Sequence, residues 1–144
     1  MALTFVRTSE LIGAQWSEFD LNKGEWRIPA ERMKMPSPHI VPLSQQAVAV
    51  LREVHTITGH GEFVFPHDSN PRKSMSNNTM LHALYRMGYG GAHDGAWLPS
   101  TVLHENGFDH AHIELQLAHM ERNTVSAAYN HATYLKQRAG MMQW

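Results

Sequence analysis

The spacing of hydrophobic residues changes along the chain from helical to strand-like. In residues 8–16 the apolar side chains recur at near-helical intervals, and Thr8 or Ser9 is a candidate N-cap. Further on, Trp26 and Ile28 alternate with charged neighbours, which is typical of a short strand. The pattern therefore predicts that a helix comes first and that strands follow it.

Turn-forming residues divide the strand-like region into short pieces. The segments 20–24 and 35–38 contain Asp, Asn, Gly, Ser and Pro, which favour turns. Proline cannot donate a hydrogen bond to a sheet, so Pro29 and Pro42 mark strand ends or edges. We expect a β-hairpin or a three-stranded meander over residues 19–43.

The rest of the pattern is mainly helical. Ser44 is a candidate N-cap for a helix that Gly59 ends, and Asn123 is a candidate N-cap for the last helix. Residues 111–118 fit either a strand or a helix, because apolar and polar residues alternate there in a composition that a helix tolerates. The other expected elements are helices over 45–57, 76–87, 100–106 and 123–135, a brief buried segment at 63–66 and a polar loop at 67–74.

Length and composition fit one mixed domain. With 144 residues, 42% of them hydrophobic, the chain can bury one core, and we expect an α+β fold. The fold should be mainly helical, with a small antiparallel sheet near the N-terminal end. No apolar run approaches the roughly 18 residues of a membrane-spanning helix. The sequence has no cysteine, which excludes disulfides, thiolate metal ligands and a thiol nucleophile, and agrees with a cytoplasmic location.

The charge balance is less informative than the pattern. Twelve Lys and Arg against thirteen Asp and Glu give a formal net charge of −1 and a pI near 6.8. A nucleic-acid-binding domain more often has a pI above about 9, so this balance counts mildly against DNA binding. The eleven histidines can add positive charge just below neutrality, so charge alone leaves nucleic-acid binding open.

Four residues that could carry chemistry have ordinary structural interpretations when each is taken alone. Arg7 beside Glu10 fits a surface ion pair, and Lys34 fits a solvated turn. His119 follows an apolar run, where a hydrogen-bonded structural histidine is common. Tyr129 lies on the apolar face of the last expected helix, as a core tyrosine would. None of the four indicates an active site by itself.

The same four residues occur in segments whose order carries more information. The segments are 4–11 (TFVRTSEL), 33–43 (MKMPSPHIVPL), 116–119 (QLAH) and 127–130 (AAYN), and together they span nearly the whole chain. They resemble the first Arg motif, the Lys-bearing β-hairpin, the Leu-Gly/Ala-His box and the nucleophile box of tyrosine recombinases, the family of phage and prophage integrases. The order Arg, Lys, His, Tyr also agrees with that family.

The resemblance implies a specific chemistry on double-stranded DNA. In such enzymes a tyrosine oxygen attacks a phosphodiester and forms a 3′-phosphotyrosyl link, which conserves the bond energy for rejoining. Tyrosine, with a pKa near 10, is a weak nucleophile unless neighbours help to remove its proton, and arginines stabilise the negative transition state. By resemblance the nucleophile is Tyr129, the first phosphate clamp is Arg7, the general acid is Lys34, and the active-site histidines are His93 and His119.

The resemblance also implies which partners the protein has. The mechanism requires no metal and no cofactor. The expected partner is double-stranded DNA resembling an attachment site, with a homo-oligomer assembled on that DNA and no contact with a membrane.

Two departures from the family pattern predict impaired activity. The central motif His-x-x-Arg is best matched by residues 93–96 (HDGA), where Ala96 stands in place of the second Arg. Losing one transition-state donor commonly costs about 10²–10³ in rate. The first motif also lies almost at the start of the sequence. We therefore expect residues 1–144 to form a single catalytic-type domain without the arm-binding and core-binding domains of full-length integrases.

Two other functions stay open at this point. One is a noncatalytic DNA-binding remnant or an integrase-interacting module on the same fold, which Ala96 favours. The other is a His-rich metal-binding protein. Its candidate ligands are His110, His112, His119 and His93, with His60 or His67 in a further site. The spacing of these histidines matches no standard zinc pattern, so this function is the less favoured one.

Overall fold

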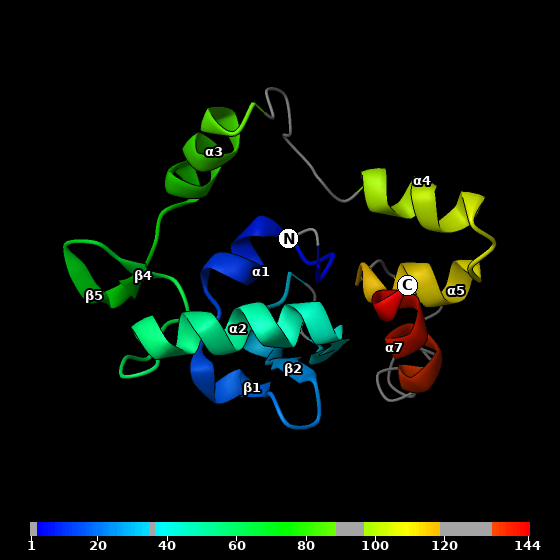
Figure 1. Cartoon of the computed structure of the whole chain (residues 1–144), viewed down its shortest axis with the longest axis horizontal. Coiled ribbons are helices and arrows are strands. Elements are labelled where there is room, and N and C mark those ends of the chain that lie inside the picture. Colours follow the sequence, from blue (N-terminus) through cyan, green and yellow to red (C-terminus); the bar gives the residue numbers. More distant parts are fainter. Residues whose placement is uncertain (1–2, 35–36, 89–96, 119–133) are drawn as a thin grey trace.

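The protein has an α+β fold that is mainly helical, as predicted. The computed structural model describes residues 3–34, 37–88, 97–118 and 134–144 (Figure 1). In these residues six helices accompany two small antiparallel sheets. The helices are α1 (Thr8–Ile12), α2 (Gln45–Thr58), α3 (Asn77–Arg86), α4 (Trp97–Glu105), α5 (His110–Gln116) and α7 (Leu135–Gln143).

The larger sheet is the three-stranded meander that the sequence predicts. Its strands are β1 (Phe19–Asp20), β2 (Glu25–Ile28) and β3 (His39–Pro42), in that order and all antiparallel. Trp26 pairs with Phe19 on one side and with Val41 on the other. Pro29 follows the last residue of β2 and Pro42 is the last residue of β3, so both prolines mark strand ends as expected.

The first hydrophobic core lies between this sheet and α2. Trp26 and Ile28 alternate with more exposed neighbours on β2, so both side chains point to one face of the sheet and are fully buried. Ser44 caps α2, its Oγ accepting a hydrogen bond from the Ala47 backbone N–H at 3.2 Å. The buried members of this core are Val6, Ala14, Trp26, Ile28, Val41, Leu43, Ala47, Leu51 and Val64.

A second, smaller core joins the helices at the C-terminal end. α4, α5 and α7 gather on one side of the sheet, away from α3 and the hairpin of β4 (Pro66–His67) and β5 (Asn70–Ser74) (Figure 1). The buried members of this core are Leu103, Ile113, Leu117 and Met141, with Phe5 and Phe108 packed against them. α7 also contacts β3, so the two cores meet beside that strand.

Three local expectations were wrong in their boundaries or type. The first helix, α1, ends at Ile12, because the chain turns at Gly13 and Gln15 then forms a β-bridge with Phe63. Arg7, not Thr8 or Ser9, occupies the N-cap position of α1. The expected polar loop at 67–74 is largely a hairpin of β4 (Pro66–His67) and β5 (Asn70–Ser74). Its side chains are mostly exposed, so no apolar alternation marks these strands.

The segment whose pattern was ambiguous is helical, and α4 and α7 differ from the expected helices. Residues 111–118 are largely helical in α5, because Asp109 caps the helix and Ile113 and Leu117 are buried one turn apart. α4 begins at Trp97, three residues before the expected start. The expected helix over 123–135 lies almost wholly outside the described residues, and α7 was not predicted.

None of the helices in the described part of the chain is long and apolar enough to cross a membrane.

Candidate active site

Arg7 and Glu10 form a reciprocal pair at the start of α1. The Arg7 backbone N–H donates to Glu10 Oε2 at 2.9 Å, and Arg7 Nη1 donates to Glu10 Oε1 at the same distance. The Glu10 side chain is only 4% exposed, whereas that of Arg7 is 33% exposed. One buried carboxylate therefore holds both the backbone and the guanidinium of Arg7, which orients a cation that still reaches solvent.

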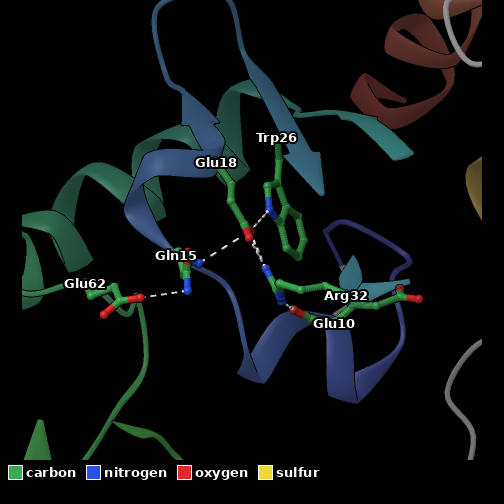
Figure 2. Close-up of polar contacts among 6 residues, drawn as sticks. All are labelled: Glu10, Gln15, Glu18, Trp26, Arg32 and Glu62. Atoms are coloured by element: carbon green, nitrogen blue, oxygen red, sulfur yellow. Dashed lines mark hydrogen bonds and ion pairs between the residues drawn. The ribbon is translucent and has the colours of Figure 1, made fainter. Parts of the chain in front are cut away.

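Arg32 lies on the connection between β2 and β3 and links that connection to α1 (Figure 2). Its Nη1 forms an ion pair with the Glu18 carboxylate, and its Nη2 donates to the backbone carbonyl of Glu10. Glu18 Oε2 also accepts a hydrogen bond from Trp26 Nε1 at 2.9 Å. A continuous chain of polar contacts thus runs from the sheet through Arg32 to the residue that orients Arg7.

Lys34 lies two residues after Arg32, on the connection that leads to β3. Arg32 ends the 3₁₀ helix η2 (Ala30–Arg32), and the Lys34 side chain is exposed. The exposure agrees equally with a solvated turn residue and with a cation available to DNA. Through Arg32, the start of the connection that carries Lys34 is therefore held against α1.

Gln116 forms a second junction, at the end of α5. It is 1% exposed, and its Nε2 donates to the backbone carbonyl of Thr4 at 3.0 Å. The backbone carbonyl oxygen of Gln116 lies 3.2 Å from Nε2 of the buried His39, the first residue of β3. Gln116 consequently joins the segment before Arg7 to the strand that follows the Lys34 connection.

Arg138 of α7 completes this junction. It is fully buried, with Nε and Nη2 bound to Gln116 Oε1 and Nη2 also bound to the carbonyl of Ile40. Burial lowers the pKa of Arg138 to about 10, so the side chain is a buried cation at neutral pH. Within the described residues its Nη1 has no hydrogen-bond partner.

The structure tests the geometry of only part of the predicted site. It describes Arg7 and Lys34, but His93, Ala96, His119 and Tyr129 lie outside the described residues. The roles of all five predicted site residues therefore remain predictions. The segment that leads to His119 is described as far as Ala118, whose φ of 51° is left-handed.

Sequence reasoning missed the residues that hold these segments together. Glu18, Arg32 and Arg138 belong to no motif and break no hydrophobic pattern, so no local signal identifies them. Gln116 was part of the quoted Leu-Ala-His box, but its side chain gave no sign of its partners. The side-chain contacts of Arg32, Gln116 and Arg138 join residues 14 to 112 positions apart in the chain, which spacing alone cannot predict.

Comparisons with known proteins agree with this architecture. A family model described as the phage integrase family matches residues 1–136. The chain is 45% identical over 145 residues to prophage integrase IntA of Escherichia coli and 45% identical over 162 residues to the integrase of Enterobacteria phage P4. These alignments cover 99% of the chain but 35% and 37% of the relatives, so the chain spans about a third of their length.

A solved structure supports the fold independently. The chain matches the crystal structure of XerA recombinase with a TM-score of 0.67 and 17% identity, over 96% of the chain and 53% of that structure. The arrangement of helices around a small sheet is thus that of a recombinase catalytic domain. The chain belongs to the phage integrase family, and its resemblance to the tyrosine recombinases is confirmed.

Proposed function

We propose that this chain is the catalytic-type domain of an integrase that breaks and rejoins double-stranded DNA at an attachment-like site. The main support is the Arg32 link, which fixes the Lys34 connection to the helix capped by Arg7. A phosphate clamp and a general acid must act on the same phosphodiester, so their segments must be held together. Membership of the phage integrase family supplies the reaction class.

In the proposed reaction the Tyr129 oxygen attacks the scissile phosphorus. A bond forms between that oxygen and phosphorus while the bond to the 5′-oxygen of the next nucleotide breaks, which leaves a 3′-phosphotyrosyl link and a 5′-hydroxyl. Lys34 gives a proton to the departing 5′-oxygen, and His93 and His119 orient groups or move the tyrosine proton. Attack by a 5′-hydroxyl on the link reverses these steps and rejoins the strand.

Arg7 stabilises the negative charge that develops on the phosphate oxygens. Its guanidinium is planar, partly exposed and oriented by a buried carboxylate, which suits recognition of phosphate. Ala96 leaves the second clamp position without a cation, so we infer that cleavage is slow compared with that of a two-arginine site. The domain would assemble on DNA as a homo-oligomer.

A DNA-cleavage assay tests the role of Arg7. We expect Arg7→Ala to slow strand cleavage of a nicked duplex by about 10²–10³ while duplex binding falls much less, since the clamp acts mainly on the transition state. Arg52→Ala is the matched control, because Arg52 is an exposed arginine on α2. Equal cleavage by the wild type and the Arg7 variant would contradict the proposal.

The second candidate is a noncatalytic DNA-binding or integrase-interacting module. The observation that favours it is Ala96, which removes a transition-state donor but need not disturb the fold. Such a module would shift the mobility of a DNA duplex, or of a partner integrase on DNA, and would form no covalent adduct. A covalent adduct at Tyr129 would exclude this candidate.

A further inference from the structure

His104, His110 and Glu114 bring their side chains together between α4 and α5. His104 lies in the last turn of α4, and His110 and Glu114 lie one turn apart on α5. Their candidate ligand atoms are all within 4.8 Å of one another. His104 Nε2 and His110 Nδ1 are 3.4 Å apart.

The local fold holds the backbones of this cluster in place. Gly107 turns the chain with a φ of 78°, which L side chains rarely adopt, and the Phe108 backbone N–H bonds back to the carbonyl of Leu103. Leu103 and Ile113, which precede His104 and Glu114 in the sequence, are both buried. The three side chains thus project from two helices that are packed against each other.

We propose that His104, His110 and Glu114 form a binding site for a divalent transition-metal ion, with Zn²⁺ as the ion they fit best. Zinc binds histidine nitrogens at about 2.0–2.1 Å in tetrahedral geometry, which places neighbouring ligand atoms about 3.3–3.4 Å apart. The separation of the two histidine nitrogens is 3.4 Å, so one ion can reach both without movement of the helices. Two histidines and one carboxylate leave a fourth position for water.

Charge and access around the cluster also suit a cation. His104 and His110 are exposed, so an ion can enter from solvent. Glu105 and Asp109 adjoin the two histidines in the sequence and add negative charge to that of Glu114. The mixed nitrogen and oxygen donors favour zinc over Mg²⁺ or Ca²⁺, which prefer oxygen ligands alone.

A hydrogen bond between two neutral histidines is the competing explanation. The two rings stack with centroids 5.1 Å apart, and one nitrogen could donate to the other. That arrangement makes no use of Glu114 as a ligand and predicts no saturable metal binding. The two explanations therefore predict different numbers of zinc ions bound per chain.

The proposed metal site uses none of the residues assigned to the reaction and would act on the fold. A bound ion would fasten α4 to α5, whose last residue is Gln116 at the junction near Arg7. Because the ion binds only the folded protein at this geometry, it would raise the midpoint of thermal unfolding. This effect needs neither DNA nor Tyr129, so it is independent of the proposed recombination.

Zinc binding to the untagged, chelator-stripped chain tests the site. Equilibrium dialysis at micromolar Zn²⁺ should give one equivalent of zinc more for the wild type than for His104→Ala or His110→Ala. Loss of one ligand should weaken that binding by about 100-fold, since even supporting residues around a metal contribute 10–100-fold. Glu114→Gln, which keeps the size but not the charge, should weaken it in the same direction.

The matched control is His112→Ala, on the same helix. His112 contacts the Tyr134 ring at 4.6 Å between centroids, and its substitution should leave zinc binding unchanged. Co²⁺ gives a second measurement, because the wild type but not the His104 variant should show the visible absorption of a four-coordinate ion. Circular dichroism confirms that each variant is folded, which the exposure of both histidines predicts. Equal zinc uptake by the wild type and all three ligand variants, or no saturable uptake, would overturn the proposal.

Discussion

Arg138 donates hydrogen bonds from both Nε and Nη2 to the same side-chain oxygen of Gln116, at 3.0 and 2.8 Å. Both residues are buried, and they lie where the two hydrophobic cores meet. Burial lowers the pKa of Arg138, so folding disfavours its charged form and the charge itself reduces stability at neutral pH. The hydrogen bonds offset that cost and fix how α7 sits against α5 and β3.

A double-mutant cycle measures this relationship. Arg138→Met should lower the free energy of unfolding by about 1–3 kcal/mol, because it leaves the buried oxygens of Gln116 and Ile40 without their donor. Gln116→Met should cost a similar amount, since it leaves a buried cation without that acceptor. The double variant should be less destabilised than the sum by about 1–3 kcal/mol in urea unfolding. Strict additivity would show that the pair is not coupled.

The ion pair of Glu18 with Arg32 should matter more than an exposed one. Glu18→Gln removes the charge partner of a mostly buried arginine, and we expect it to cost about 2–4 kcal/mol of unfolding free energy. Glu25→Gln, which breaks the exposed pair with Arg27, is the control and should cost less than about 1 kcal/mol. Similar losses in chemical denaturation for both variants would contradict the structural role given to Arg32.

Ala118 is held in a left-handed conformation immediately before His119. Its φ is 51°, where a side chain with a Cβ is strained and a β-branched one is strained further. We expect Ala118→Gly to stabilise the protein by about 0.5–1 kcal/mol and Ala118→Val to destabilise it by about 1–2 kcal/mol. The reverse order of thermal unfolding midpoints would contradict this backbone geometry.

The general-acid role of Lys34 predicts a specific chemical rescue. Lys34→Ala should slow cleavage of ordinary DNA by about 10²–10⁴, the usual contribution of a positioned proton donor. With sulfur in place of the bridging 5′-oxygen, the leaving thiolate needs no proton, because a thiol has a pKa near 8.5. The variant should then cleave almost as fast as the wild type. Lys23→Ala, at an exposed turn lysine, should behave as the wild type on both substrates.

Sequence predicted the elements whose signals are local. Ser44 caps α2 because its hydroxyl reaches a backbone N–H only three residues away, a pattern visible in the sequence. The alternation of Trp26 and Ile28 places both on the buried face of β2, which periodicity alone reveals. The order of the motifs likewise identified the family that the comparisons confirmed.

The parts of the fold that the sequence did not predict depend on contacts between polar residues that are distant in the chain. α7 escaped prediction because its buried face includes Arg138, a charged residue that a hydrophobic pattern places outside. Gln116 gained its role only when folding placed it beside Thr4, which is 112 residues away. The roles assigned to His93, His119 and Tyr129 stay predictions that chemistry must test.

Covalent trapping on DNA tests the central claim most directly. A library of duplexes with randomised cores removes the need to know the target sequence. Each duplex carries a nick, so cleavage releases the short end of the broken strand and the strand cannot be rejoined. We expect a slow covalent protein–DNA product with the wild type, faster by about 10²–10³ with Ala96→Arg. Tyr134→Phe, at an exposed tyrosine, should keep the product, whereas Tyr129→Phe should abolish it. A product that survives in Tyr129→Phe, or no product from either the wild type or Ala96→Arg, would contradict the account.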